Sequence, residues 1–177
     1  MNKIRRVGLF GGPGTGKSTM GALLYAHLKK DHVNVEFVQE YVKSWAYEKR
    51  VVSSFDQVYL LAKQIGMEDL VLRNGVDYVI TDSPVGMSTC YAQNYGFKEW
   101  KSLVEVAKAF EDKYPSLNIF MDRGDMEYQS HGRYQTKQEA IEMDEIIMKH
   151  LKDSGRPFEV IDCRDVESAW SLIEKIL

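Results

Sequence analysis

The chain of 177 residues is 44% apolar and 28% charged, which is the balance of an ordinary soluble globular protein and fits one compact domain. That composition excludes a disordered chain, a collagen-like repeat and a small scaffold held together by disulfides. The net charge is −3, from 23 Lys and Arg against 26 Asp and Glu. The chain therefore has no general attraction for nucleic acid or an acidic membrane, although a local basic groove is not excluded.

Nothing in the sequence indicates secretion or a membrane. The first ten residues contain too short an apolar run for a signal peptide, and no run approaches the ~18 apolar residues of a membrane span. The two cysteines, Cys90 and Cys163, match no metal-ligand spacing and are expected to be buried thiols in a reducing compartment. We therefore expect a cytoplasmic protein without a membrane partner.

Short apolar runs alternate with segments of helical spacing along the whole chain, without a linker, which predicts a single domain over residues 1–177. We expect strands at 4–10, 33–38, 76–81, 117–121 and 158–161. We expect helices at 17–30, from 54 to about 73, across 87–114 with a break near 96, from 136 to about 154, and over 166–177. Capping boxes are predicted at Ser54 with Gln57 and at Thr136 with Glu139.

Five strands separated by helices predict an α/β fold of three layers, with a parallel sheet covered on both faces, because parallel neighbours need long crossovers. Ligands of such sheets bind at the carboxyl ends of the strands. Residues that follow each predicted strand are therefore the first candidates for chemistry.

The segment that follows the first strand matches a phosphate-binding loop. Residues 11–18 read GGPGTGKS and agree with G-x-x-x-x-G-K-[ST] at every fixed position. Glycines let successive N–H groups face phosphate oxygens, Lys17 neutralises phosphate charge, and the Ser18 hydroxyl binds Mg²⁺. The predicted ATP-binding residues are Gly12, Pro13, Gly14, Thr15, Gly16, Lys17, Ser18 and Thr19.

Two carboxylates follow predicted strands. Asp82 follows VDYVIT, the pattern of a Walker B strand, and is predicted to bind Mg²⁺ with Ser18; the alternative is an acid that caps a turn. Glu40 follows the second strand and is our first choice for the base that takes a proton from a hydroxyl acceptor. The alternatives are a surface acid at Glu40, or Asp82 as the base.

The segment 123–135 after the fourth strand is polar, contains two glycines and is about twice the usual connection length. We predict a lid there, with Arg123 and Arg133 closing over the phosphates; the alternative is two solvated arginines on a loop.

Aromatic and amide side chains follow the second strand and are expected on the acceptor side. Rings can stack on a base and amides can read its edge, although any of these residues could instead pack in the core or on the surface. The predicted acceptor-binding residues are Tyr41, Trp45, Gln57, Gln64 and Pro84. Basic residues at 49–50 and 98–101 could touch a nucleic-acid backbone or form a solvated face.

Four segments together, GGPGTGKST, QEYVK, ITDSP and GRYQT, resemble the phage-type P-loop nucleotide kinases, which are similar to thymidylate kinases and include 5-hydroxymethyl-deoxyuridine DNA kinases. The resemblance covers nearly the whole chain. It implies the strand order 2-3-1-4-5, ATP with Mg²⁺ as the donor, an arginine-bearing lid and, for a phage-encoded chain, the host cytoplasm.

The sequence therefore predicts an ATP-dependent kinase with a nucleoside-type acceptor, and most specifically the hydroxymethyl group of 5-hydroxymethyluracil in phage DNA. One alternative is a deoxynucleoside monophosphate or nucleoside kinase that acts on free nucleotides. Another is a P-loop ATPase switch without an acceptor. The sequence does not predict the oligomeric state.

Overall fold

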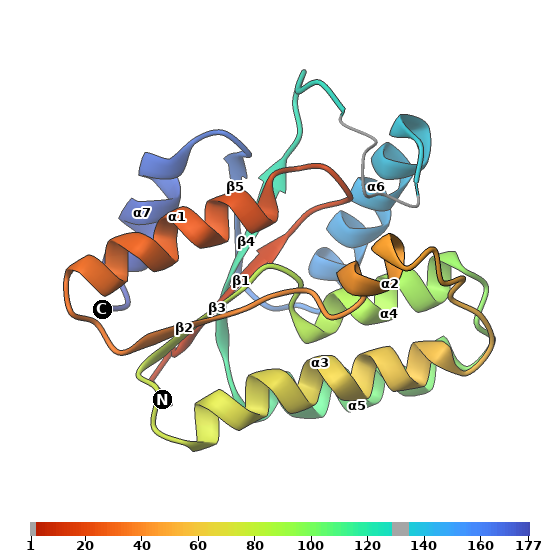
Figure 1. The fold of residues 1–177 in the computed structure, drawn as a ribbon, viewed down its shortest axis with the longest axis horizontal. Coiled ribbons are helices and arrows are strands. Elements are labelled where there is room, and N and C mark those ends of the chain that lie inside the picture. The colour runs from red at the N-terminus through yellow and green to blue at the C-terminus, as the bar shows by residue number, and fades with distance from the viewer. Residues whose placement is uncertain (1–2, 129–134) are drawn as a thin grey trace.

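The computed structural model describes residues 3–128 and 135–177, which form a parallel five-stranded sheet between two layers of helices (Figure 1). The strands are β1 (Arg6–Phe10), β2 (Val35–Val38), β3 (Tyr78–Thr81), β4 (Ser116–Asp122) and β5 (Phe158–Asp162). Their order across the sheet is β2-β3-β1-β4-β5, and every pair is parallel. The predicted fold class and strand order are confirmed.

The helices are α1 (Lys17–Lys30), α2 (Lys43–Tyr47), α3 (Asp56–Arg73), α4 (Val85–Asn94), α5 (Trp100–Lys113), α6 (Lys137–Asp153) and α7 (Val166–Glu174). In Figure 1, α1 and α7 cover one face of the sheet, and α3, α4, α5 and α6 cover the other.

Alternation along the strands builds the two cores. Val7 and Leu9 of β1 pack with α1 and α7, whereas Phe10 packs with α4 and α6. Ile119 and Phe120 of β4 divide in the same way. Because side chains along a strand point to opposite faces, a central strand that is covered on both sides is apolar at successive positions.

The sequence located the elements well and missed some of their ends. α1 has the predicted bounds, and the capping box of Thr136 and Glu139 is present at the start of α6. The capping box at Ser54 is wrong: Ser54 has a φ of 48°, and α3 begins two residues later. There the Asp56 carboxylate accepts a hydrogen bond from the Ser53 amide instead, at 3.1 Å.

The parallel sheet brings the carboxyl ends of β1, β2, β3 and β4 to one edge. The loop 11–18, Glu40, Asp82 and Arg123 follow these four strand ends, so the topology gathers the predicted site residues.

Both cysteines are buried, as predicted, and burial raises the pKa of the Cys90 thiol to about 12. Within 3–128 and 135–177, no helix has the length and apolar character that a membrane crossing needs.

Candidate functional site

The loop between β1 and α1 has the backbone geometry of a phosphate-binding loop. Gly14 and Gly16 have φ values of 82° and 78°, which L-residues rarely adopt. A side chain on Gly14 would also clash, because its Cβ would stand 2.9 Å from the ring of Tyr128. Gly16 is the N-cap of α1, so the amides that follow it point out of the helix start, where the dipole favours an anion.

The Lys17 side chain returns over this loop. The side chain is only 7% exposed, and its Nζ donates to the carbonyl oxygens of Gly11 and Gly12, at 2.7 and 2.9 Å. The Thr15 hydroxyl donates to the Gly12 carbonyl at 3.0 Å and so helps to fix the curve of the loop. The loop therefore holds a buried cation at the edge of the sheet.

Ser18 and Asp82 meet at the start of α1. The Ser18 hydroxyl donates to Asp82 Oδ2 at 2.5 Å, and Asp82 is 2% exposed. Asp82 Oδ1 is buried and has no hydrogen-bond partner among the residues that the structure describes. An unpaired buried carboxylate oxygen beside a hydroxyl suits Mg²⁺, which takes oxygen ligands and usually one or two carboxylates. The residues present therefore fit the predicted ion.

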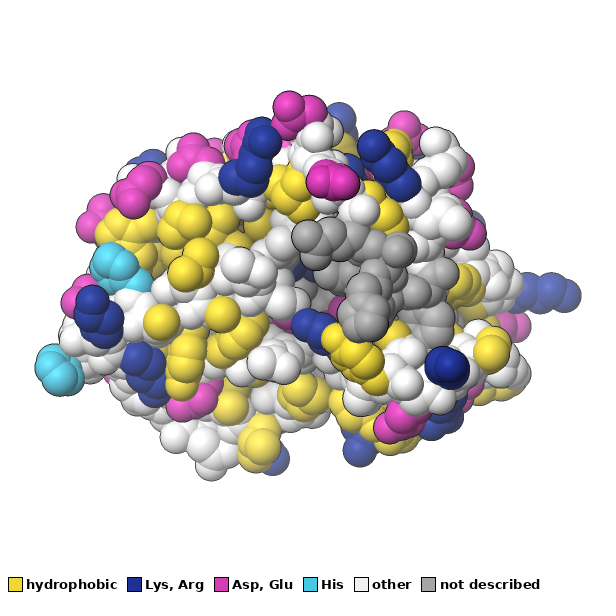
Figure 2. Space-filling model, turned by 45° about the horizontal axis from the view of Figure 1, so that its top comes forward, with side chains coloured by type: hydrophobic (Ala, Val, Ile, Leu, Met, Phe, Trp, Pro, Cys, Tyr) yellow, Lys and Arg dark blue, Asp and Glu magenta, His cyan; other side chains and the backbone are white. Residues whose placement is uncertain are grey.

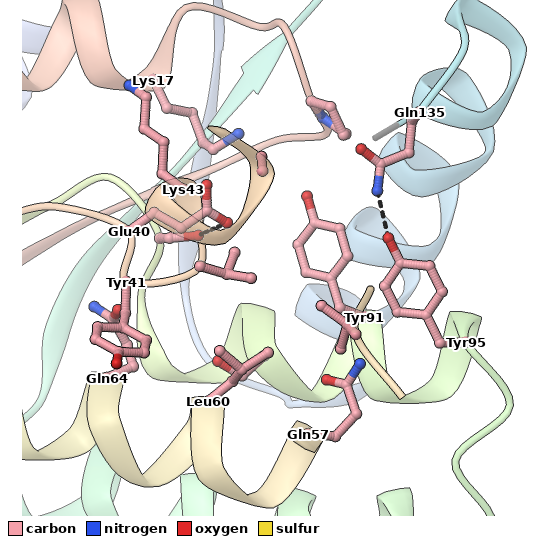
Figure 3. A pocket seen from close by; sticks show the side chains of 16 residues that line it. Lys17, Glu40, Tyr41, Lys43, Gln57, Leu60, Gln64, Tyr91, Tyr95 and Gln135 are labelled. Atoms are coloured by element: carbon pink, nitrogen blue, oxygen red, sulfur yellow. Dashed lines mark hydrogen bonds between the residues drawn. The ribbon is translucent and has the colours of Figure 1, made fainter. Parts of the chain in front are cut away.

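Glu40 follows β2 and lines the cavity at the phosphate-binding loop. Its Oε1 accepts a hydrogen bond from the Ser83 hydroxyl at 3.1 Å, which fixes the carboxylate (Figure 3). Lys43, one turn further on, has its Nζ 3.4 Å from Ser18 Oγ. The carboxylate is thus placed close to two lysines, Lys17 and Lys43.

Two cavities lie side by side at this edge of the sheet. The loop cavity is lined by Gly14, Gly16, Lys17, Ser18, Thr19, Glu40, Lys43 and Asp82. The side pocket lies between α2, α3 and α4 and is closed at one end by Pro13 and Gln135. Lys17, Glu40 and Lys43 line both cavities, so a group bound in one can reach a group bound in the other.

The side pocket contains three of the predicted acceptor-binding residues. Tyr41, Gln57 and Gln64 line it, and both glutamines belong to α3 (Figure 3). Gln57 and Gln64 are each only 3% exposed, which is rare for amide side chains.

Trp45 and Pro84 do not line the side pocket. Trp45 is 3% exposed because its ring stacks on Tyr59, with centroids 5.9 Å apart, and carries the Arg50 guanidinium 3.3 Å from its own centroid. Pro84 lies against Gly8 of β1. Both side chains therefore contact other parts of the protein and not the side pocket.

The sequence analysis missed several residues of the site. Lys43 follows Glu40 by three positions in a turn, and that spacing was the available signal. Ser88 and Tyr91 of α4 and Tyr95, the residue that caps its end, line the side pocket, and their helical spacing puts them on one face. Gln135 donates to the Tyr95 hydroxyl at 2.6 Å (Figure 3); it stands in the GRYQT segment, but the sequence does not place it at this pocket, because the packing of α6 on α4 brings it there.

Arg123 lies against the loop and not on an exposed cover. It is 6% exposed, its Nε donates to Asp144 of α6 at 2.8 Å, and its Nη2 donates to the Pro13 carbonyl at 2.8 Å. Asp144 also accepts a hydrogen bond from the Gly12 amide at 2.5 Å. The pair therefore ties α6 to the loop. Arg133, the second predicted lid arginine, lies outside the described residues.

The fold and the loop define a P-loop protein of the α/β class, and solved kinases share this fold. A NadR protein in complex with NR matches with a TM-score of 0.78 and 16% identity, over 97% of this chain and 51% of that chain. A deoxyadenosine kinase from M. mycoides matches with a TM-score of 0.57 and 17% identity, over 96% and 97% of the two chains. A thymidylate kinase from Ehrlichia chaffeensis matches with a TM-score of 0.65 and 16% identity, over 99% of both chains.

The sequence profile AAA_28, described as "AAA domain", matches residues 6–168, and the chain belongs to this family. No curated protein sequence matches the chain. The present chain spans about half the length of the NadR chain.

Proposed function

We propose that this protein is an ATP-dependent kinase that transfers the γ-phosphoryl group to a nucleoside-type acceptor. The observation that carries the proposal is the contact between the two cavities. The loop cavity has the residues for a polyphosphate, the side pocket has rings and amides for a base, and Lys17, Glu40 and Lys43 belong to both. Such adjacency is what in-line transfer between a donor and an acceptor needs.

In this proposal, the loop amides and the α1 start bind the phosphates, and Lys17 neutralises their charge. Ser18 and Asp82 would hold Mg²⁺, which supplies further neutralisation of the phosphate oxygens when bound. Arg123 keeps the loop in shape through Asp144 and Pro13, and its Nη1, which is buried without a hydrogen-bond partner among the described residues, remains for the predicted role over the phosphates.

For a hydroxyl acceptor, the acceptor oxygen forms a bond to the γ-phosphorus while the bond from that phosphorus to the β,γ-bridging oxygen breaks and ADP leaves. The hydroxyl proton goes to Glu40, which Ser83 holds beside both cavities. Lys43 adds a second cation at the point of transfer.

The most specific form of the proposal takes the hydroxymethyl group of 5-hydroxymethyluracil in DNA as the acceptor, which a duplex would have to flip out of its stack. The resemblance of the four sequence segments supports it. The charge of the chain favours the second candidate, a free nucleoside or nucleotide: the net charge is −3, and on the face drawn in Figure 2 Lys and Arg are scattered among acidic and apolar side chains.

An acceptor screen with radiolabelled ATP and Mg²⁺ tests the proposal. DNA that contains 5-hydroxymethyluracil is compared with unmodified DNA, free nucleosides and monophosphates. Label in any of these supports a kinase, and label only in mononucleotides ends the DNA form. ATP hydrolysis that no acceptor stimulates would instead indicate the third candidate, an ATPase switch.

A further inference from the structure

We infer that Gln64 presents a fixed hydrogen-bond acceptor to the side pocket, so that the pocket selects molecules carrying an N–H donor on a ring or on a group attached to it. The inference rests on the proposed function, because it takes the side pocket as the acceptor site. It adds that one side of this pocket offers a hydrogen-bond acceptor and not a donor. The evidence is a buried polar network behind Gln64.

The network begins with a buried ion pair between β1 and α3. Arg6 and Glu68 both have fully buried side chains, and Arg6 Nε and Nη2 donate to Glu68 Oε2 at 2.9 and 2.6 Å. Arg6 Nη1 donates to the Tyr114 carbonyl at 2.8 Å. Arginine stays charged in proteins, and the carboxylate that pairs with it offers only hydrogen-bond acceptors.

The other oxygen of Glu68 orients Gln64. Gln64 Nε2 donates to Glu68 Oε1 at 3.2 Å and to Thr81 Oγ1 at 3.4 Å, and the Thr81 hydroxyl donates to Glu68 Oε1 at 3.4 Å. Gln64 and Thr81 thus both donate to the same carboxylate oxygen, and Gln64 also donates to Thr81. A flipped amide would put the Gln64 oxygen against Glu68 in a buried place, which is strongly unfavourable.

The Gln64 carbonyl oxygen is the atom that remains for the pocket. Gln64 lines the side pocket, and within the described part of the chain its Oε1 accepts no hydrogen bond and is not sealed from solvent. Gln57, seven residues earlier on α3, also lines the pocket, but no described residue orients its amide. The pocket therefore has one fixed acceptor and one amide that can adapt.

Two small molecules with the matching donor serve as probes. The ring imide of a uracil or thymine nucleoside carries one N–H, and the carboxamide of nicotinamide riboside carries two. In each case a close analogue lacks the donor: 3-methylthymidine replaces N–H by N–CH₃, and nicotinic acid riboside replaces the carboxamide by a carboxylate. A site that is built to pair a hydrogen bond rejects the analogue that leaves it unpaired.

Binding of these four compounds, measured by calorimetry without ATP, tests the inference separately from catalysis. We expect the N–H member of at least one pair to bind 10- to 100-fold more tightly, and the pair that discriminates identifies the source of the N–H. Gln64→Met keeps the volume and removes the amide, and we expect it to bring that ratio to within about threefold of one. Thr81→Val removes one partner of Gln64 and should lower the ratio partly.

Tyr114→Phe is the matched control, because it also removes one hydroxyl on the α3–α5 side, whose partner is Asp69 at 2.8 Å and not Gln64. It should leave the ratio unchanged. Equal binding within both pairs, no binding of any of the four, or an undiminished ratio in Gln64→Met overturns the inference. Discrimination without phosphoryl transfer to any acceptor would contradict the proposed function and leave the inference intact.

Discussion

The loop cavity and the side pocket share an edge, yet they are assembled from the chain in different ways. Five of the eight residues that line the loop cavity lie between positions 14 and 19, so one short segment forms most of the cavity wall. The side pocket takes residues from positions 13 to 135: Pro13 and Lys17 of the loop, the segment around α2, helices α3 and α4, and Gln135 just before α6. One site is a local conformation of the chain, whereas the other depends on how distant helices pack.

That difference separates two kinds of chemistry. A local loop of amides and glycines can recognise any polyphosphate, because it reads charge and not a base. A pocket of side chains can differ between related proteins with the same fold, because helix packing and side-chain type vary while the sheet is kept. The comparison predicts that changes on the loop affect every acceptor equally and that changes in the pocket affect acceptors selectively.

The largest effect is expected for Lys17→Ala. It removes a buried cation from the loop, and we expect kcat to fall by about 100- to 1,000-fold with every acceptor. Steady-state kinetics with two acceptors of different type measure it, and Lys30→Ala at the exposed end of α1 is the control. Turnover within a few fold of the wild type would contradict the proposed role of Lys17.

Glu40→Gln should distinguish acceptors where Lys17→Ala does not. The amide cannot take a proton, so transfer to a hydroxyl should fall by about 100-fold, whereas transfer to a phosphate should change by only a few fold. The measurement is kcat for a nucleoside and for a monophosphate, with Glu36→Gln on β2 as the matched control. An equal loss with both acceptors would show that Glu40 acts in some way other than as the base.

The sequence predicted the loop and the strand ends because their signals are local: a motif with fixed spacing, and apolar runs that end in polar residues. It assigned Trp45 to the acceptor because an aromatic residue follows β2, but the five-residue helix α2 turns that ring against Tyr59. A helix this short has no periodic pattern to detect. Tyr95 and Gln135 come together only through the packing of α4 on α6, which no single segment encodes.

Helix α6 connects the two regions, since Asp144 touches the loop and Gln135, just before the helix, lines the side pocket. Asp144→Asn leaves Arg123 buried beside a neutral partner and weakens the bond to the Gly12 amide. We expect the free energy of unfolding to fall by about 2 to 3 kcal/mol and the Kd for ATP to rise. Denaturant unfolding and calorimetry measure these, with Asp153→Asn near the exposed end of α6 as the control. A loss of stability with unchanged ATP affinity would contradict the link from α6 to the loop.

The smallest effect concerns the start of α6, next to Gln135. Hydrogen bonds from the Thr136 backbone and side chain lower the pKa of Glu139 below its ordinary value of 4.5. A lowered folded-state pKa stabilises the fold above the unfolded value, and this contribution is lost as the pH falls from about 4.5 through the folded value. Glu139→Gln keeps a capping partner but removes the charge, so wild type should exceed the variant in stability at pH 7, and the difference should shrink toward pH 3. Denaturant unfolding at both pH values measures it. If the difference in stability is the same at both pH values, the charge of Glu139 does not stabilise the start of α6, and only the hydrogen bonds of the capping box do. The start of α6 next to Gln135 would then have a stability that does not depend on pH in this range.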